Sequence, residues 1–174
     1  MSNTREYAIN MNAIKKLHLA KLGLLALFLL TCFSQAMAGD WNLKDKDGVR
    51  YKLADQKGKW VLVNFWAPWC PSCIAEIPDL NKLQLQHKDV LVIGVAVMYR
   101  NKNEVLDIVK TQSVSYPVVM GNEDIASNFG EMNGMPTSFL YSPSGQLIGH
   151  HDGPLTQTEI EQAIAQKDDS IFIR

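Results

Sequence analysis

The chain has 174 residues, of which 47% are hydrophobic and 20% are charged, and its formal net charge at pH 7 is −1. This length and apolar content are typical of one globular domain with an ordinary core. No basic patch interleaved with aromatic residues is present in the sequence, which argues against a nucleic-acid partner.

The first 38 residues have the pattern of a secretory signal peptide. Basic residues precede an apolar run at residues 22–33, and Ala36-Met37-Ala38 offers a small-x-small cleavage site. We therefore expect residues 39–174 to form the folded domain of an exported protein. Two alternatives stay open, namely lipidation at Cys32 and an uncleaved inner-membrane tether, although the apolar run is shorter than the roughly 20 residues of a membrane span.

The expected domain opens with a small hairpin over residues 41–53, because Asp47-Gly48 lies between two short alternating segments. Residues 60–66 follow as a strand. Nearly every position in this strand is apolar, as expected for a strand that is covered on both faces.

The strand leads into Cys70-Pro71-Ser72-Cys73, followed by helix-compatible sequence. A helix that begins at Cys70 or Pro71 places both sulfurs one turn apart on the same face, within reach of an unstrained disulfide. Proline suits a first helical turn, where its missing N–H has no partner. The helix N-terminus should lower the Cys70 pKa below the usual value of about 8.5. We predict that Cys70 attacks and that the more shielded Cys73 resolves.

The remaining elements predict an α/β domain. The first helix should extend to about His87, with Ile77 and Leu80 on its buried face and a kink at Pro78. The later pattern predicts strands at 90–97, 116–120, 138–141 and 146–150, helices at 103–111, 123–129 and 156–166, and a loose tail after Lys167. Thr156 and Glu159 form a capping-box pattern at the last helix. This order predicts a central mixed β-sheet with helices on both faces.

The cysteine count favours chemistry over stabilisation. Of three cysteines, only Cys70 and Cys73 lie in the expected domain, whereas exported disulfide frameworks normally use more cysteines spread along the chain. A disulfide that closes so short a loop also constrains the unfolded chain little. We therefore interpret the pair as redox-active.

The sequence resembles the thioredoxin superfamily and, within it, the exported TlpA/ResA-like thiol–disulfide oxidoreductases. The resemblance is carried by Lys59 through Cys73, by Glu76 with Pro78, and by Gly134-Met-Pro-Thr-Ser-Phe-Leu140. It covers most of residues 41–166 and implies a thioredoxin-like fold. Residues 102–120 match the helix-and-strand insertion of the exported group.

The resemblance also implies roles for individual residues. Cys70 would be the nucleophile and Cys73 the resolving thiol. Met135-Pro136 would form a cis-proline loop whose backbone pairs with an extended substrate, although from the residues alone Pro136 could equally be a trans proline that opens a strand. Apart from the resemblance, Trp66 and Trp69 could both contact a partner; we expect at least one of them to pack in the core and Trp69 to be the exposed one.

A proton acceptor for Cys73 is suggested by a departure from the cytosolic pattern. Cytosolic thioredoxins carry a buried aspartate where this chain has Asn64. Glu76, three residues after Cys73 and on the same helix face, is the replacement that similar exported proteins carry. If it is buried, its raised pKa would allow proton exchange near neutral pH. The alternative is a solvated acid favoured by the helix dipole.

Other polar motifs suggest no further chemistry. His150-His151 is expected to lie on the surface beside a turn, with no third ligand nearby for a metal. Asp152-Gly153 has the pattern of a turn without a catalytic role. We expect no metal, and no cofactor besides the Cys70–Cys73 disulfide.

These features predict a periplasmic thiol–disulfide oxidoreductase that reduces client proteins and is itself reduced again by a membrane thiol donor. Cytochrome c maturation and metal-centre assembly are both processes that could use the reduced client cysteines. The alternatives are an oxidant that donates its disulfide and a Cu(I) carrier that uses the cysteine pair. A peroxidase would need a threonine shortly before the nucleophile, and residues 65–69 contain none.

Overall fold

A computed structural model describes residues 41–166 and 170–173 of the chain. The predicted signal peptide and the alternative tether at residues 22–33 lie outside the described residues. Within the described part, no helix is both long enough and apolar enough to cross a membrane.

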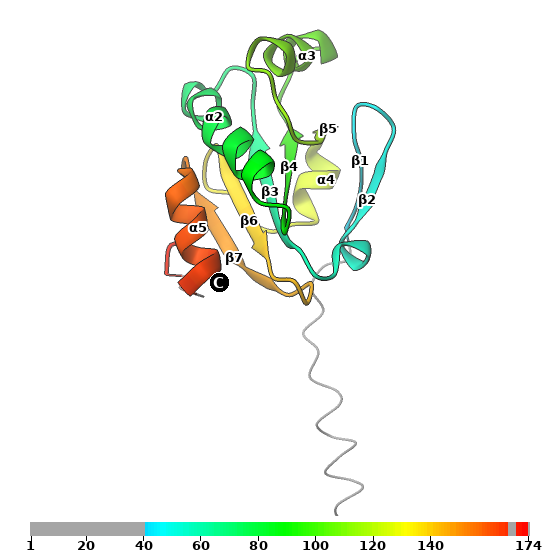
Figure 1. The fold of residues 1–174 in the computed structure, drawn as a ribbon. Coiled ribbons are helices and arrows are strands. Elements are labelled where there is room, and N and C mark those ends of the chain that lie inside the picture. The colour runs from blue at the N-terminus through cyan, green and yellow to red at the C-terminus, as the bar shows by residue number, and fades with distance from the viewer. Residues whose placement is uncertain (1–40, 167–169, 174) are drawn as a thin grey trace, which may run out of the picture. The chain divides into compact units, whose positions relative to one another are not determined.

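A five-stranded mixed sheet forms the centre of the domain, with the strand order β5-β4-β3-β6-β7 (Figure 1). Strands β3 and β5 each pair parallel with β4, whereas β6 pairs antiparallel with both β3 and β7. The predicted mixed sheet is therefore confirmed. Its strands are β3 (Trp60–Trp66), β4 (Val90–Ala96), β5 (Val118–Met120), β6 (Thr137–Tyr141) and β7 (Leu147–Asp152).

Helices cover both faces of this sheet, as predicted. One face packs against α2 (Pro71–Gln86), α3 (Lys102–Thr111) and α5 (Gln157–Gln166). The other face packs against α4 (Glu123–Ser127), the hairpin β1 (Asn42–Lys44)–β2 (Arg50–Lys52), and the 3₁₀ helix η1 (Leu53–Gln56).

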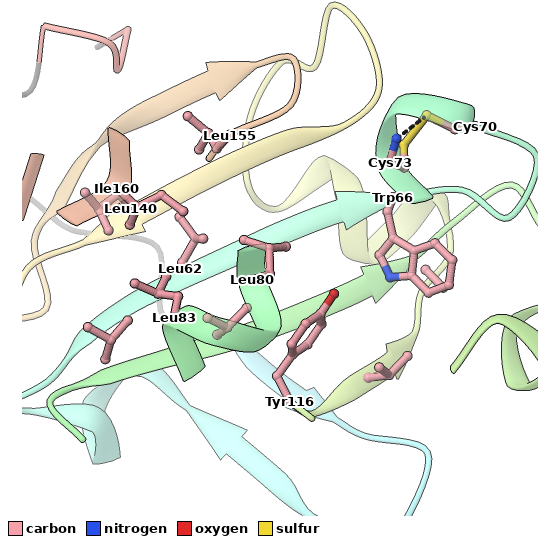
Figure 2. Packing of buried hydrophobic residues seen from close by; sticks show 14 of the residues in the cluster. Leu62, Trp66, Cys70, Cys73, Leu80, Leu83, Tyr116, Leu140, Leu155 and Ile160 are labelled. Atoms are coloured by element: carbon pink, nitrogen blue, oxygen red, sulfur yellow. Dashed lines mark hydrogen bonds between the residues drawn. A yellow bond between two sulfur atoms is a disulfide. The ribbon is translucent and has the colours of Figure 1, made fainter. Parts of the chain in front are cut away.

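The central strand β3 contributes side chains to both cores because successive residues of a strand point to opposite faces. Leu62 and Trp66 belong to the core that includes residues of α2 and α5, and Figure 2 shows Leu62 near Leu140 and Trp66 on the side of Tyr116. Val63 and Phe65 pack on the opposite face. The almost continuous apolar run in the sequence is thus explained by burial on both sides.

Helix α2 holds the sequence motif at its first turn. Cys70 is the N-cap residue and Pro71 occupies the first helical position. The helix buries a stripe that includes Cys73, Ile77 and Leu80, as predicted, and it continues through Pro78. Cys73 is therefore fixed in the interior by the same stripe that packs the helix on the sheet.

The C-terminal tail differs from the prediction. Residues 170–173 are not loose, because Phe172 is buried in the core that includes α5. Ile173 also forms an antiparallel bridge with His150 through N–H···O contacts of 2.6 and 2.9 Å. An open strand edge supplies unpaired backbone groups for such a bridge. His150 and His151 are consequently half-buried within β7 rather than exposed beside a turn.

Candidate active site

The two cysteines form a disulfide at the N-terminus of α2, with their Cα atoms 5.3 Å apart. Both are buried, with exposed fractions of 4% for Cys70 and 0% for Cys73. The backbone N–H of Cys73 donates to the Cys70 sulfur at 3.2 Å, which Figure 2 shows as a dashed line. After reduction, this donor and the helix N-terminus would both stabilise a thiolate on Cys70.

A proline loop, which we define as residues 133–137, lies against the disulfide. Its Met135–Pro136 peptide bond is cis. The carbonyl oxygen of Met135 lies 3.7 Å from the Cys70 sulfur and 3.5 Å from the Ser72 hydroxyl. The Ser72 hydroxyl is also 3.3 Å from that sulfur. No signal in the sequence pointed to these contacts of Ser72 beyond its place between the two cysteines.

The two tryptophans near the motif differ in exposure, and Trp69 is the exposed one, as predicted. Trp66 is 2% exposed and packs in the core, whereas Trp69 is 62% exposed. The indole N–H of Trp69 donates to the carbonyl oxygen of Met98 at 3.0 Å. Met98 has a left-handed backbone with φ of 53° and is itself exposed, and nothing in the sequence had marked it.

A cavity of about 800 Å³ opens beside Cys70. Its walls are formed by the motif, the turn after β4, the start of α4 and the proline loop. Large apolar side chains dominate these walls, including Trp69, Met98, Tyr99, Met132 and Met135. The cavity can therefore receive an apolar side chain next to the disulfide.

Glu76 lies inside the domain, only 3% exposed, which excludes the alternative of a solvated acid. Its Oε1 accepts a hydrogen bond from Asn64 Nδ2 at 2.8 Å, and its Oε2 accepts one from the backbone N–H of Leu155 at 3.0 Å. Burial raises the pKa of Glu76 to about 7, against the opposing effect of these two hydrogen bonds. The carboxyl can therefore exchange a proton near neutral pH, one helical turn from Cys73.

Asp152 is the main feature that sequence reasoning placed wrongly. It is the last residue of β7 and lies opposite Thr137 in the sheet, rather than in a free turn. Its carboxylate accepts hydrogen bonds from Thr137 and Asn133, at the two ends of the proline loop. The dipeptide Asp152-Gly153 has a turn-like composition, so the sequence offered no signal for this contact.

The profile of the AhpC/TSA family matches residues 35–150. The chain belongs to the AhpC/TSA family. Over 131 residues it is 33% identical to the thioredoxin-like protein YneN of Bacillus subtilis (strain 168), which covers 73% of this chain and 76% of YneN. Over 127 residues it is 32% identical to the thiol-disulfide oxidoreductase ResA of the same organism, which covers 71% of this chain and 69% of ResA.

A solved structure supports the thioredoxin-like fold. A thiol:disulfide interchange protein of the thioredoxin family from Chlorobium tepidum TLS has a TM-score of 0.66 at 31% identity. The similarity covers 74% of this chain and 92% of that chain. The resemblance to ResA-like proteins and the thioredoxin-like fold are thus confirmed, and the chain is a thiol–disulfide oxidoreductase.

Proposed function

We propose that this protein works in the periplasm and reduces disulfides of client proteins through Cys70 and Cys73. The observation that carries the proposal is the apolar cavity that Cys70 helps to line. The leader pattern of residues 1–38 supports export.

The reaction begins with the reduced pair. The Cys70 thiolate attacks one sulfur of a client disulfide, so a mixed disulfide forms and the other client sulfur leaves as a thiolate. Cys73 then loses its proton and attacks the Cys70 sulfur. The second client thiolate leaves, and the Cys70–Cys73 disulfide forms. Two electrons pass from the pair to the client, and no separate cofactor takes part.

Glu76 accepts the proton of Cys73 in this proposal. The support is its position one turn along α2, its burial and a pKa raised to about 7 by that burial. A carboxyl with this pKa is partly ionised at neutral pH, so it can take a proton and release it again.

Trp69, Met135 and Pro136 bind the client. Trp69 and Met135 line the cavity, and the Met135 carbonyl lies beside the reacting sulfur. A client chain bonded through its cysteine to Cys70 would place a neighbouring apolar side chain in the cavity and its backbone along the proline loop.

A reductase in an oxidising compartment must be reduced again after each turnover. A membrane thiol donor is the partner that this requirement implies. Cytochrome c maturation and metal-centre assembly both consume reduced cysteines outside the cytoplasm, and they are the destinations that we propose for the electrons.

The reduction potential of the Cys70/Cys73 pair tests the direction of transfer. The chain without residues 1–38 would be equilibrated with glutathione or dithiothreitol and its thiols counted by alkylation. A potential near or below about −250 mV supports a reductase, whereas one near about −120 mV makes the protein an oxidant. Failure to exchange, together with retained Cu(I), would favour a metal carrier.

A further inference from the structure

We propose that Asp152 is a positioning residue whose carboxylate holds the proline loop in the place from which Met135 meets a client. The proposal rests on the proposed function, because only a client chain laid along this loop would depend on its position.

Both carboxylate oxygens of Asp152 are used. The Thr137 hydroxyl donates to Oδ1 at 2.7 Å, and Asn133 Nδ2 donates to Oδ2 at 3.1 Å. The next residue, Gly153, donates its backbone N–H to the carbonyl oxygen of Pro136 at 2.8 Å. The end of β7 therefore holds the first residue and the last two residues of the proline loop.

The residues held in this way form part of the active-site wall. Asn133 and Met135 line the cavity beside Cys70, and the Met135 carbonyl oxygen lies 3.7 Å from the Cys70 sulfur. The proline loop lies within the segment between the end of α4 at Ser127 and the start of β6 at Thr137, which has no regular secondary structure (Figure 1). Side-chain contacts such as those of Asp152 thus have to supply the rigidity that a helix or strand would otherwise give.

The charge of Asp152 suits this task. Burial raises the pKa of the carboxyl, but hydrogen bonds from Thr137 and Asn133 and the nearby His150 outweigh burial and hold it below the usual value. The carboxylate is therefore ionised at neutral pH. Hydrogen bonds to an ionised acceptor are stronger than those between neutral groups, so one side chain can fix both ends of the loop.

The test compares two oxidised substrates of the full-length protein. One is a disulfide-linked dimer of a peptide with apolar residues on both sides of its cysteine. The other is the small aromatic disulfide 5,5′-dithiobis(2-nitrobenzoate), which has no backbone to lay along the loop. Asp152→Ala should lower kcat/KM for the peptide at least about tenfold, mainly through KM, because the loop is displaced. Its rate with the small disulfide should change much less than its rate with the peptide.

Two further variants test the positioning role of Asp152. Asp152→Asn keeps an acceptor for the Thr137 hydroxyl and should recover part of the lost peptide activity. Thr137→Val keeps the shape of a buried strand residue but removes the contacts of its hydroxyl with Asp152 and with the Gly134 carbonyl oxygen, so it tests how the loop is held even if Asp152→Ala fails to fold. It should lower peptide reduction selectively.

Asp45→Ala is the matched control. The Asp45 carboxylate also accepts two hydrogen bonds, from the backbone N–H groups of Asp47 and Val49 at 2.9 and 2.8 Å, but within the β1–β2 hairpin. Its ratio of peptide to small-disulfide rates should equal that of the wild type. Equal losses with both substrates in Asp152→Ala and Thr137→Val, or no loss in either variant, would overturn the positioning role. A wild-type protein that reduces neither substrate would overturn the proposed function instead.

Discussion

Asn64 donates a 2.8 Å hydrogen bond to Glu76 across the interior of the domain, from β3 to α2. The same amide nitrogen donates to the Ser138 hydroxyl at 3.0 Å, so the strand residue orients the helix residue and is itself held by β6. Cytosolic thioredoxins place the buried carboxyl on the strand, whereas this chain places an amide there and the carboxyl on the helix.

Replacing Glu76 by glutamine should change how stability depends on pH. The pKa of Glu76 is raised from 4.5 to about 7, so the native protein keeps a proton that the unfolded chain releases. The stability this gives is fully present below the unfolded pKa and is lost as pH rises through the folded pKa. Glu76→Gln cannot ionise, so its stability relative to wild type should rise by roughly 3 kcal/mol from below this window to above it. Urea unfolding of the oxidised proteins across this pH range measures the difference. Parallel plots of unfolding free energy against pH for the two proteins would contradict the prediction.

Replacing Asn64 by leucine should raise the pKa of Glu76 further, because the hydrogen bond from Asn64 opposes the effect of burial. The pH midpoint for resolution of a mixed disulfide by Cys73 should rise by about one unit. Stopped-flow measurements on a preformed mixed disulfide would report this midpoint. Ser138→Ala is the control, since it removes the other partner of the amide and keeps the bond to Glu76. An unmoved midpoint in Asn64→Leu would show that another group takes the proton.

Trp69 should contribute to client binding and little to folding. Its side chain is 62% exposed, and its one hydrogen bond goes to the Met98 carbonyl. We expect Trp69→Ala to lower kcat/KM for the apolar peptide disulfide about tenfold or more, as removal of a tryptophan from a binding surface commonly does. The melting temperature should stay close to that of the wild type. Leu85→Ala is the control. It removes an exposed apolar side chain on α2, away from the cavity, and should leave kcat/KM and the melting temperature unchanged.

The sequence alone predicted the local structure wherever residues close together in the chain determine it. The apolar run of β3 predicted a strand buried on both faces, and this strand lies at the centre of the sheet. The Thr156 and Glu159 pattern predicted a capping box, and the two residues bond reciprocally at 2.8 and 3.3 Å. Periodicity and capping involve residues close together in the chain, so they can be recognised without the fold.

Contacts between distant segments could not be predicted in this way. Glu76 accepts a hydrogen bond from the backbone N–H of Leu155, which lies 79 residues away in the sequence, in the segment before α5. The role of Asp152 depends on the β6–β7 register, which places it opposite Thr137. A single-residue shift of that register would turn the carboxylate to the other face of the sheet.

Phe172 should be needed for stability, although it lies in the tail that the sequence suggested was loose. Its ring is 5% exposed and packs in the core that includes α5. Removing a buried phenyl ring leaves a cavity, so Phe172→Ala should lower the free energy of unfolding by about 3 kcal/mol. Ile173→Ala is the matched control, because this neighbour is 59% exposed and keeps its backbone bridge to His150. Urea unfolding measures both variants, and equal losses would contradict a specific contribution of the buried Phe172 ring.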